Sequence, residues 1–86
     1  MDRQAHFEKE QSEYLKALGL QIVKLRKKKK MSRVTLAESL QTHTQYILDV
    51  EAGRKNPSIY VVARFARALD MSMPELLKSL SLKPID

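Results

Sequence analysis

The sequence predicts an all-α fold in one small domain, and three observations favour it. Apolar residues recur at three- and four-residue spacing along most of the chain, which places them on one face of a helix. No run of alternating β-branched residues is long enough to indicate a strand. Gly53, Pro57 and Pro74 lie between the periodic segments or at the start of one, where helices end and begin. Five helices are expected.

The first helix is expected from about Tyr14 to Lys28, with one apolar face made by Leu15, Leu18, Ile22 and Leu25. The lysines at its end stabilise the helix, because their positive charge lies near the negative C-terminal pole of the helix dipole. Residues 1–13 are polar but rich in helix formers, so they either extend this helix, with a frayed start, or form a mobile arm. We prefer the extension.

Two short helical patterns follow, separated by about three residues. Ser32 is the expected N-cap of a helix from Arg33 to Leu40, which buries Leu36, Ala37 and Leu40. The next helix is expected from about Thr44 to Ala52, with Ile47 and Val50 facing inward and Gly53 ending it at positive φ. Two helices so close in sequence must cross steeply and share one core, which is the geometry of a helix-turn-helix.

A fourth helix is expected from Ser58, which can also cap it, to Leu69, with a buried face of Ile59, Val62, Phe65, Ala66 and Leu69. Ser72 caps a last short helix with Pro74 in its first turn. The expected organisation is therefore an N-terminal extension over residues 1–13, a helix-turn-helix domain over residues 14–80, and a loose tail over residues 81–86.

Composition narrows the classes of function. A chain of 86 residues, 43% of them apolar, can form one core but no cleft between domains and no separate ligand-sensing domain. Cysteine is absent, which excludes disulfides and thiolate metal sites and suits a cytoplasmic protein. No secretory signal and no apolar run of about 20 residues is present. We expect no membrane partner, no cofactor and no small-molecule ligand.

An enzyme is not expected either. His6 and His43 are the only histidines, and neither has a metal-ligand spacing. A glycine-rich phosphate loop is also missing from the sequence.

The charge distribution points to a nucleic acid. The net charge is +6, and the excess is clustered at Lys24, Arg26, Lys27 to Lys30 and Arg33, with a second cluster at Arg54 and Lys55. Clustered basic charge is the electrostatic footprint of a DNA-binding domain. The alternative is that the lysine run is a solvated helix end without a partner. In a helix-turn-helix, the second helix projects and can enter a major groove.

A family resemblance spans about Leu18 to Leu77. It is carried first by Leu18-Gly19, Ile22, Leu25-Arg26, Met31-Ser32, Leu36-Ala37 and Leu40. Its strongest part is His43, Tyr46-Ile47, Asp49, Glu51 and Gly53 to Ser58. The chain resembles Cro and phage-repressor type regulators, also called the xenobiotic-response-element family, and within it the restriction–modification controller branch. The resemblance implies a five-helix lambda-repressor-like domain that binds double-stranded DNA as a homodimer.

The resemblance also assigns roles by position. The exposed side of the recognition helix would offer base-reading candidates, namely Thr44, Gln45, Leu48 and Asp49. Candidates for contact with the DNA backbone are Arg33, His43, Tyr46, Arg54, Lys55 and Asn56. Gln45 is the best candidate for a base, because its amide can pair with adenine. Alternatives stay open for three residues. Leu48 contacts a thymine methyl group, the core or a protein partner. His43 caps the helix instead of contacting phosphate, and the Tyr46 ring packs beside the preceding helix instead of contacting the DNA backbone.

One departure from the family pattern, one ion pair and one interface complete the sequence-based expectations. Gln41 replaces the usual turn glycine, so a residue with a Cβ is expected at positive φ. The family often pairs the positions of Arg26 and Glu51 in a partly buried salt bridge, and we favour that bridge over two separate surface charges. The dimer interface is expected in the last helix and the end of the fourth, at Met71, Met73, Leu76, Leu77 and Leu80, although some of these close the core.

Two hypotheses for function follow. The leading one is a sequence-specific DNA-binding transcriptional regulator that acts as a homodimer on a near-palindromic operator. The other is a protein-interaction module, such as an antitoxin-like or accessory subunit, that uses the same fold with Leu48 and the last helix against a partner.

Overall fold

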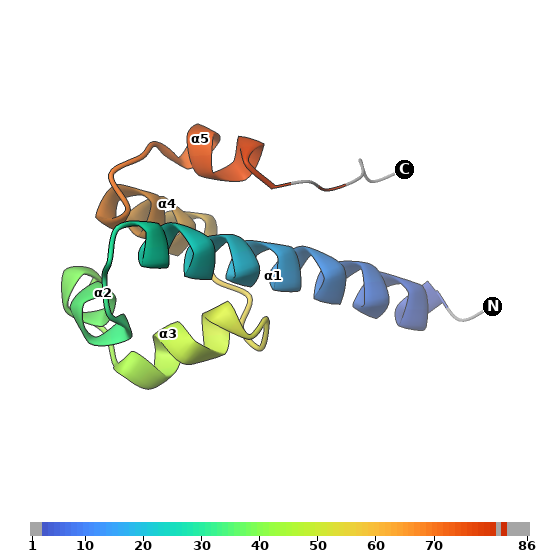
Figure 1. Ribbon diagram of the computed structural model, residues 1–86. Coiled ribbons are helices and arrows are strands. Elements are labelled where there is room, and N and C mark those ends of the chain that lie inside the picture. The colour runs from blue at the N-terminus through green and yellow to red at the C-terminus, as the bar shows by residue number, and fades with distance from the viewer. Residues whose placement is uncertain (1–2, 81, 83–86) are drawn as a thin grey trace.

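The computed structural model describes residues 3–80 and 82, and this part of the chain contains helices and no strand (Figure 1). The helices are α1 (Arg3–Lys28), α2 (Arg33–Leu40), α3 (Thr44–Glu51), α4 (Ile59–Ala68) and α5 (Met73–Lys78). The predicted all-α class with its five helices is confirmed. Of the tail predicted over residues 81–86, all but residue 82 lies outside the described residues, as do residues 1–2.

Helix α1 is longer than the apolar pattern alone indicated. It begins at Arg3 instead of near Tyr14, so residues 3–13 adopt the helical alternative. Its 26 residues make a rod of about 39 Å. The N-terminal half of this rod projects beyond α2, α3 and α4 (Figure 1), which gives the molecule a long dimension of 44 Å against 24 and 21 Å.

Serine side chains begin three of the helices, as the sequence predicts. Ser32, Ser58 and Ser72 accept hydrogen bonds from the backbone N–H groups of Thr35, Val61 and Glu75. Each such cap stabilises a helix by about 1 kcal/mol. Helices α3 and α4 end within one residue of their expected bounds, which is the ordinary uncertainty of a helix end.

One core holds all five helices together. Each helix contributes a side chain with no exposed surface: Ile22, Leu36, Ile47, Phe65 and Leu76. The expected inward positions of α2 and α3 are confirmed, because Ala37, Leu40 and Val50 are also buried. Helix α1 packs on α3, α2 packs on both α3 and α4, and α5 packs on α4.

Two expectations about apolar residues are wrong. Ile59 is 71% exposed instead of buried: it is the first residue of α4, and the buried face of that helix begins one turn later, at Val62. Leu76 is completely buried, so it belongs to the core and not to a dimer interface. Met71, Met73 and Leu80 are partly buried against that core. A helix as short as α5 has little stability of its own and remains in place by burying its apolar side against the core. Leu77, at 43% exposed, is the large apolar residue that α5 leaves outside.

Gly19 allows α1 and α3 to approach closely. A Cβ atom on Gly19 would lie 2.3 Å from the backbone oxygen of Glu51 and 2.6 Å from that of Val50. Both distances are far shorter than a van der Waals contact. The glycine is therefore required for the crossing of these two helices.

The turn between α2 and α3 uses a left-handed residue. Gln41 has φ 55° and ψ 47°, so the expected positive φ at this non-glycine position is confirmed. Its N–H donates to the carbonyl oxygen of Glu38, and the N–H of Thr42 donates to that of Ala37. After α3, Gly53 has φ 77°, as its helix-ending position predicts.

Candidate nucleic-acid interface

Helix α3 has one face in the core and the other in solvent. Ile47 and Val50 are buried, whereas Thr44 and Gln45 are exposed and Leu48 is 36% exposed. The helix lies at the edge of the molecule, with α1 across its inner side (Figure 1). Four of the predicted contact residues, Thr44, Gln45, Leu48 and Asp49, thus share an accessible or partly accessible helix surface. Leu48 lies outside the core, so contact with a thymine methyl group and contact with a protein partner remain as its two alternatives.

Asp49 holds two neighbours together on this surface. Its Oδ1 atom accepts hydrogen bonds from Nε2 of Gln45 at 3.0 Å and from Nε and Nη2 of Arg54 at 3.1 and 2.8 Å. The hydrogen bonds from Arg54, followed by the one from Gln45, hold the pKa of the Asp49 carboxyl below its ordinary value. The carboxylate is therefore ionised and already engaged within the protein.

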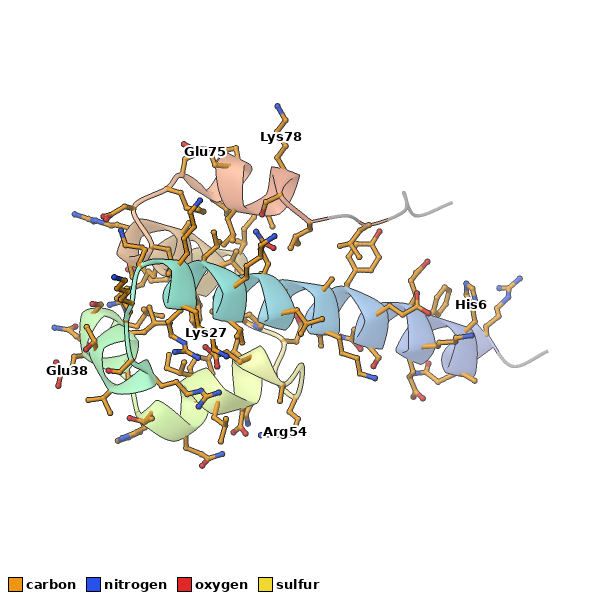
Figure 2. The ribbon with its side chains drawn as sticks, in the orientation of Figure 1. His6, Lys27, Glu38, Arg54, Glu75 and Lys78 are labelled. Carbon is orange, nitrogen blue, oxygen red and sulfur yellow. The ribbon has the colours of Figure 1, made fainter. Side chains whose placement is uncertain are left out.

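The segment after α3 supplies exposed basic and polar side chains. Arg54, Lys55 and Asn56 are all exposed. Figure 2 shows Arg54 at the C-terminal end of α3, on the side away from α1. Guanidinium, ammonium and amide N–H groups are the usual donors to phosphate oxygens. These three residues therefore extend the outer surface of α3 with phosphate-binding chemistry.

Glu51 is a buried carboxylate at the junction where α1, α2 and α3 meet. Its Oε2 accepts from Nε of Arg26 at 2.7 Å, and its Oε1 accepts from Nη2 of Arg26 at 3.3 Å. Arg26 also donates from Nη1 to the backbone oxygen of Met31 at 3.0 Å. The Arg26 and Glu51 side chains are only 7% and 3% exposed. The ion pair expected between α1 and α3 is thus present and almost fully desolvated.

Arg33 adds a partner that the sequence did not indicate. Its Nε donates to Oε1 of Glu51 at 2.7 Å, while its side chain stays 42% exposed. Glu51 therefore connects α1, α2 and α3. Arg33, proposed for contact with the DNA backbone, is not a free side chain, because one of its donors is directed inward and the rest of the guanidinium borders the surface.

His43 and Tyr46 lie at the start of α3. His43 is the N-cap residue of α3, but its side chain is exposed and makes no capping hydrogen bond, so the imidazole itself does not cap the helix. Tyr46 is partly buried and packs against the core, which is the structural alternative for this residue. That burial raises the pKa of the Tyr46 phenol above its ordinary value.

One lysine of the run at the end of α1 is paired within the protein. Nζ of Lys29 forms an ion pair with Asp70, in the turn between α4 and α5. Lys27, Lys28 and Lys30 are exposed. At least one lysine of the run is therefore directed toward the α4–α5 turn and not toward α3.

The described residues meet neither the requirements of a membrane helix nor those of a metal site. Among the residues that the structure describes, no helix is long and apolar enough to cross a membrane. Within the same residues, no three His, Cys, Asp or Glu side chains are grouped so that they could hold a metal ion.

A short exposed helix that follows another across a tight turn, with both on one core, defines the helix-turn-helix class. The chain belongs to the helix-turn-helix family HTH_3, of the Cro/C1 type, which matches residues 22–76. The predicted family is thereby confirmed. No match was found among curated proteins.

Solved structures agree with this assignment. The restriction–modification controller protein C.AhdI from Aeromonas hydrophila is 34% identical, with 72% of this chain and 94% of that chain covered and a TM-score of 0.69. The clp gene regulator ClgR from Corynebacterium glutamicum is 30% identical, with 73% and 67% covered and a TM-score of 0.70. The controller protein C.Esp1396I is 26% identical, with 83% and 95% covered and a TM-score of 0.69. C.Esp1396I has also been solved as a tetramer in complex with its natural 35 base-pair operator.

Proposed function

We propose that this chain is a sequence-specific DNA-binding transcriptional regulator that acts as a homodimer on a near-palindromic operator. The observation that supports this most directly is the outer face of α3, where Thr44 and Gln45 are exposed and the exposed Arg54 binds Asp49 at 2.8 Å. C.Esp1396I, which shares the fold, is known with its operator, and C.AhdI and ClgR are a controller protein and a gene regulator. A bound dimer would act by occupancy, either blocking polymerase or recruiting it.

Each side chain has a place in this proposal. Thr44, Gln45 and Leu48 would face base edges in the major groove, with Leu48 against a thymine methyl group. Asp49, the fourth candidate for base contact, lies beside Gln45 on the same surface. Contacts with the DNA backbone would come from Arg33, His43, Tyr46, Arg54, Lys55 and Asn56, with Tyr46 limited to its hydroxyl group because its ring is partly buried. The role involves no catalytic step. The proposal includes a cytoplasmic location, in the same compartment as the DNA.

The backbone contact of Lys55 is tested by the salt dependence of binding. Lys55→Ala is expected to weaken binding to all sequences alike and to make the slope of log K against log salt less steep by about 0.9, the value for one phosphate contact. Lys78→Ala is the matched control, because it removes the same charge from α5, which lies on the opposite side from Arg54 (Figure 2). Gel shifts across a salt series measure both slopes.

Equal slopes for the two lysine variants would remove Lys55 from the interface. Absence of any DNA binding by the unaltered protein, even at low salt, would contradict the proposed function. Together with capture of a defined protein partner, that outcome would support the interaction-module hypothesis.

The proposed homodimer is tested at Leu77, the exposed leucine of α5. Leu77→Glu is expected to keep the helical circular dichroism spectrum, shift sedimentation toward the monomer and weaken operator binding, because a charge would be buried at the interface. Leu20→Glu is the control, since Leu20 is 69% exposed on α1 and the same charge is added. An unaltered protein that sediments as a monomer at about ten micromolar would contradict a stable solution dimer.

A further inference from the structure

We propose that Asp49 is a positioning residue for DNA recognition, which orients the amide of Gln45 toward a base and links it to Arg54. This inference rests on the proposed function. Gln45 and Asp49 are one helical turn apart on α3, and Arg54 lies beyond the end of that helix. One carboxylate therefore connects a candidate for base contact with a candidate for backbone contact.

The first step concerns the direction of the Gln45 amide. A carboxylate only accepts hydrogen bonds, so the group of Gln45 that lies 3.0 Å from Oδ1 of Asp49 must be its NH2 group. One N–H bond of the amide is cis to its carbonyl oxygen and the other is trans. An amide that donates its trans hydrogen to Asp49 leaves its oxygen and its cis hydrogen adjacent to each other and available to a base. That acceptor and donor match the N6 donor and N7 acceptor on the major-groove edge of adenine. Without Asp49, the exposed amide can rotate and present the two groups in other directions.

The second step concerns Arg54. Its Nε and Nη2 both donate to the same oxygen of Asp49, at 3.1 and 2.8 Å, which fixes the plane of the guanidinium. The Nη1 group has no such bond to Asp49, so its hydrogens can reach a phosphate. The pairing also compensates the negative charge of Asp49, which would otherwise repel a phosphate backbone.

The third step separates positioning from direct contact with a base. An aspartate can accept a hydrogen bond from N4 of cytosine, so Asp49 is itself a candidate for base contact. Its side chain is only 18% exposed, however, and Oδ1 already accepts three hydrogen bonds. Gln45, in contrast, is exposed. The geometry thus favours Gln45 at the base and Asp49 behind it.

The experiment is selection of bound sequences from random duplex DNA, with the unaltered chain, Gln45→Ala, Asp49→Ala, Asp49→Asn and the double variant Gln45→Ala/Asp49→Ala. Gln45→Ala is expected to reduce the preference for one base by about 5- to 150-fold, the effect of one bidentate contact. Asp49→Ala should reduce the preference at that same position, and the double variant should be no worse there than Gln45→Ala alone. Asp49→Asn keeps an acceptor oxygen, so it should retain part of the preference.

Several results would overturn the proposal. If Asp49→Ala alters a different position in the selected sequence, then Asp49 contacts a base directly. An unchanged profile in Asp49→Ala would show that Gln45 needs no positioning. Urea unfolding of each variant is measured in parallel, so that a loss of preference is attributed to recognition only where stability is retained. If the unaltered chain selects no sequence, the proposed function fails and this inference fails with it, which is a different result from a variant without effect.

Discussion

Replacement of Glu51 by alanine is expected to lower the free energy of unfolding by about 3–5 kcal/mol, the range for removing one partner of a buried ion pair. The carboxylate is 3% exposed and accepts hydrogen bonds from Arg26 and Arg33. Its loss leaves the guanidinium of Arg26, itself 7% exposed, without a counter-charge between α1 and α3. Arg33 would lose the contact that ties α2 to α3.

The matched control is Glu38→Ala, which also removes one carboxylate from a helix. Glu38 is exposed on α2 and its side chain points away from the molecule (Figure 2). Its replacement should change stability by no more than about 0.5 kcal/mol. Urea unfolding monitored by circular dichroism gives both values. Equal midpoints for the two variants would contradict a stabilising role for the Glu51 junction.

Gly19→Ala is expected to destabilise the protein by about 1–3 kcal/mol or more, the usual cost of adding atoms to a packed site. An alanine inside an exposed helix is normally favoured over glycine by about 1 kcal/mol, so the expected sign is the reverse of the helix preference. The reason is that the new methyl group would meet the backbone oxygens of Val50 and Glu51, which cannot move without separating α1 from α3.

Lys24→Ala is the control for helix preference, because Lys24 is exposed on the same helix. It should be nearly neutral. A Gly19→Ala protein as stable as the unaltered protein would show that α1 and α3 are not in the close contact described above. A loss of DNA binding that parallels the loss of stability is also expected, since α3 is held in place by this contact.

The fold could be predicted well from the sequence because its signals are local. Helix spacing, serine caps at Ser32, Ser58 and Ser72, and Gly53 act within a few residues of their own position. Such signals do not reveal where the core ends. Ile59 has the spacing of the buried face of α4 but is exposed, whereas α5 packs on α4 and buries Leu76 completely. Both outcomes depend on how helices pack, which the apolar pattern alone does not determine.

The candidate site was predictable in part. Gln45 and Asp49 are four residues apart, a spacing that indicates a contact along a helix. Gly19, inside a long helical pattern, also carries a signal, because a glycine there costs stability unless packing requires it. The contact of Arg54 with Asp49 spans a helix end, and that of Arg33 with Glu51 joins two helices. Neither follows from spacing, because each depends on the angle at which chain segments meet.

The most direct test of the central claim is selection of bound sequences from random duplex DNA by the unaltered 86-residue chain. Specific recognition by a small helix-turn-helix dimer predicts one enriched motif, made of two inverted half-sites whose centres lie about one helical turn, ~34 Å, apart. A selection that enriches no sequence at low salt would contradict sequence-specific DNA binding, and enrichment of a single half-site would contradict the homodimer.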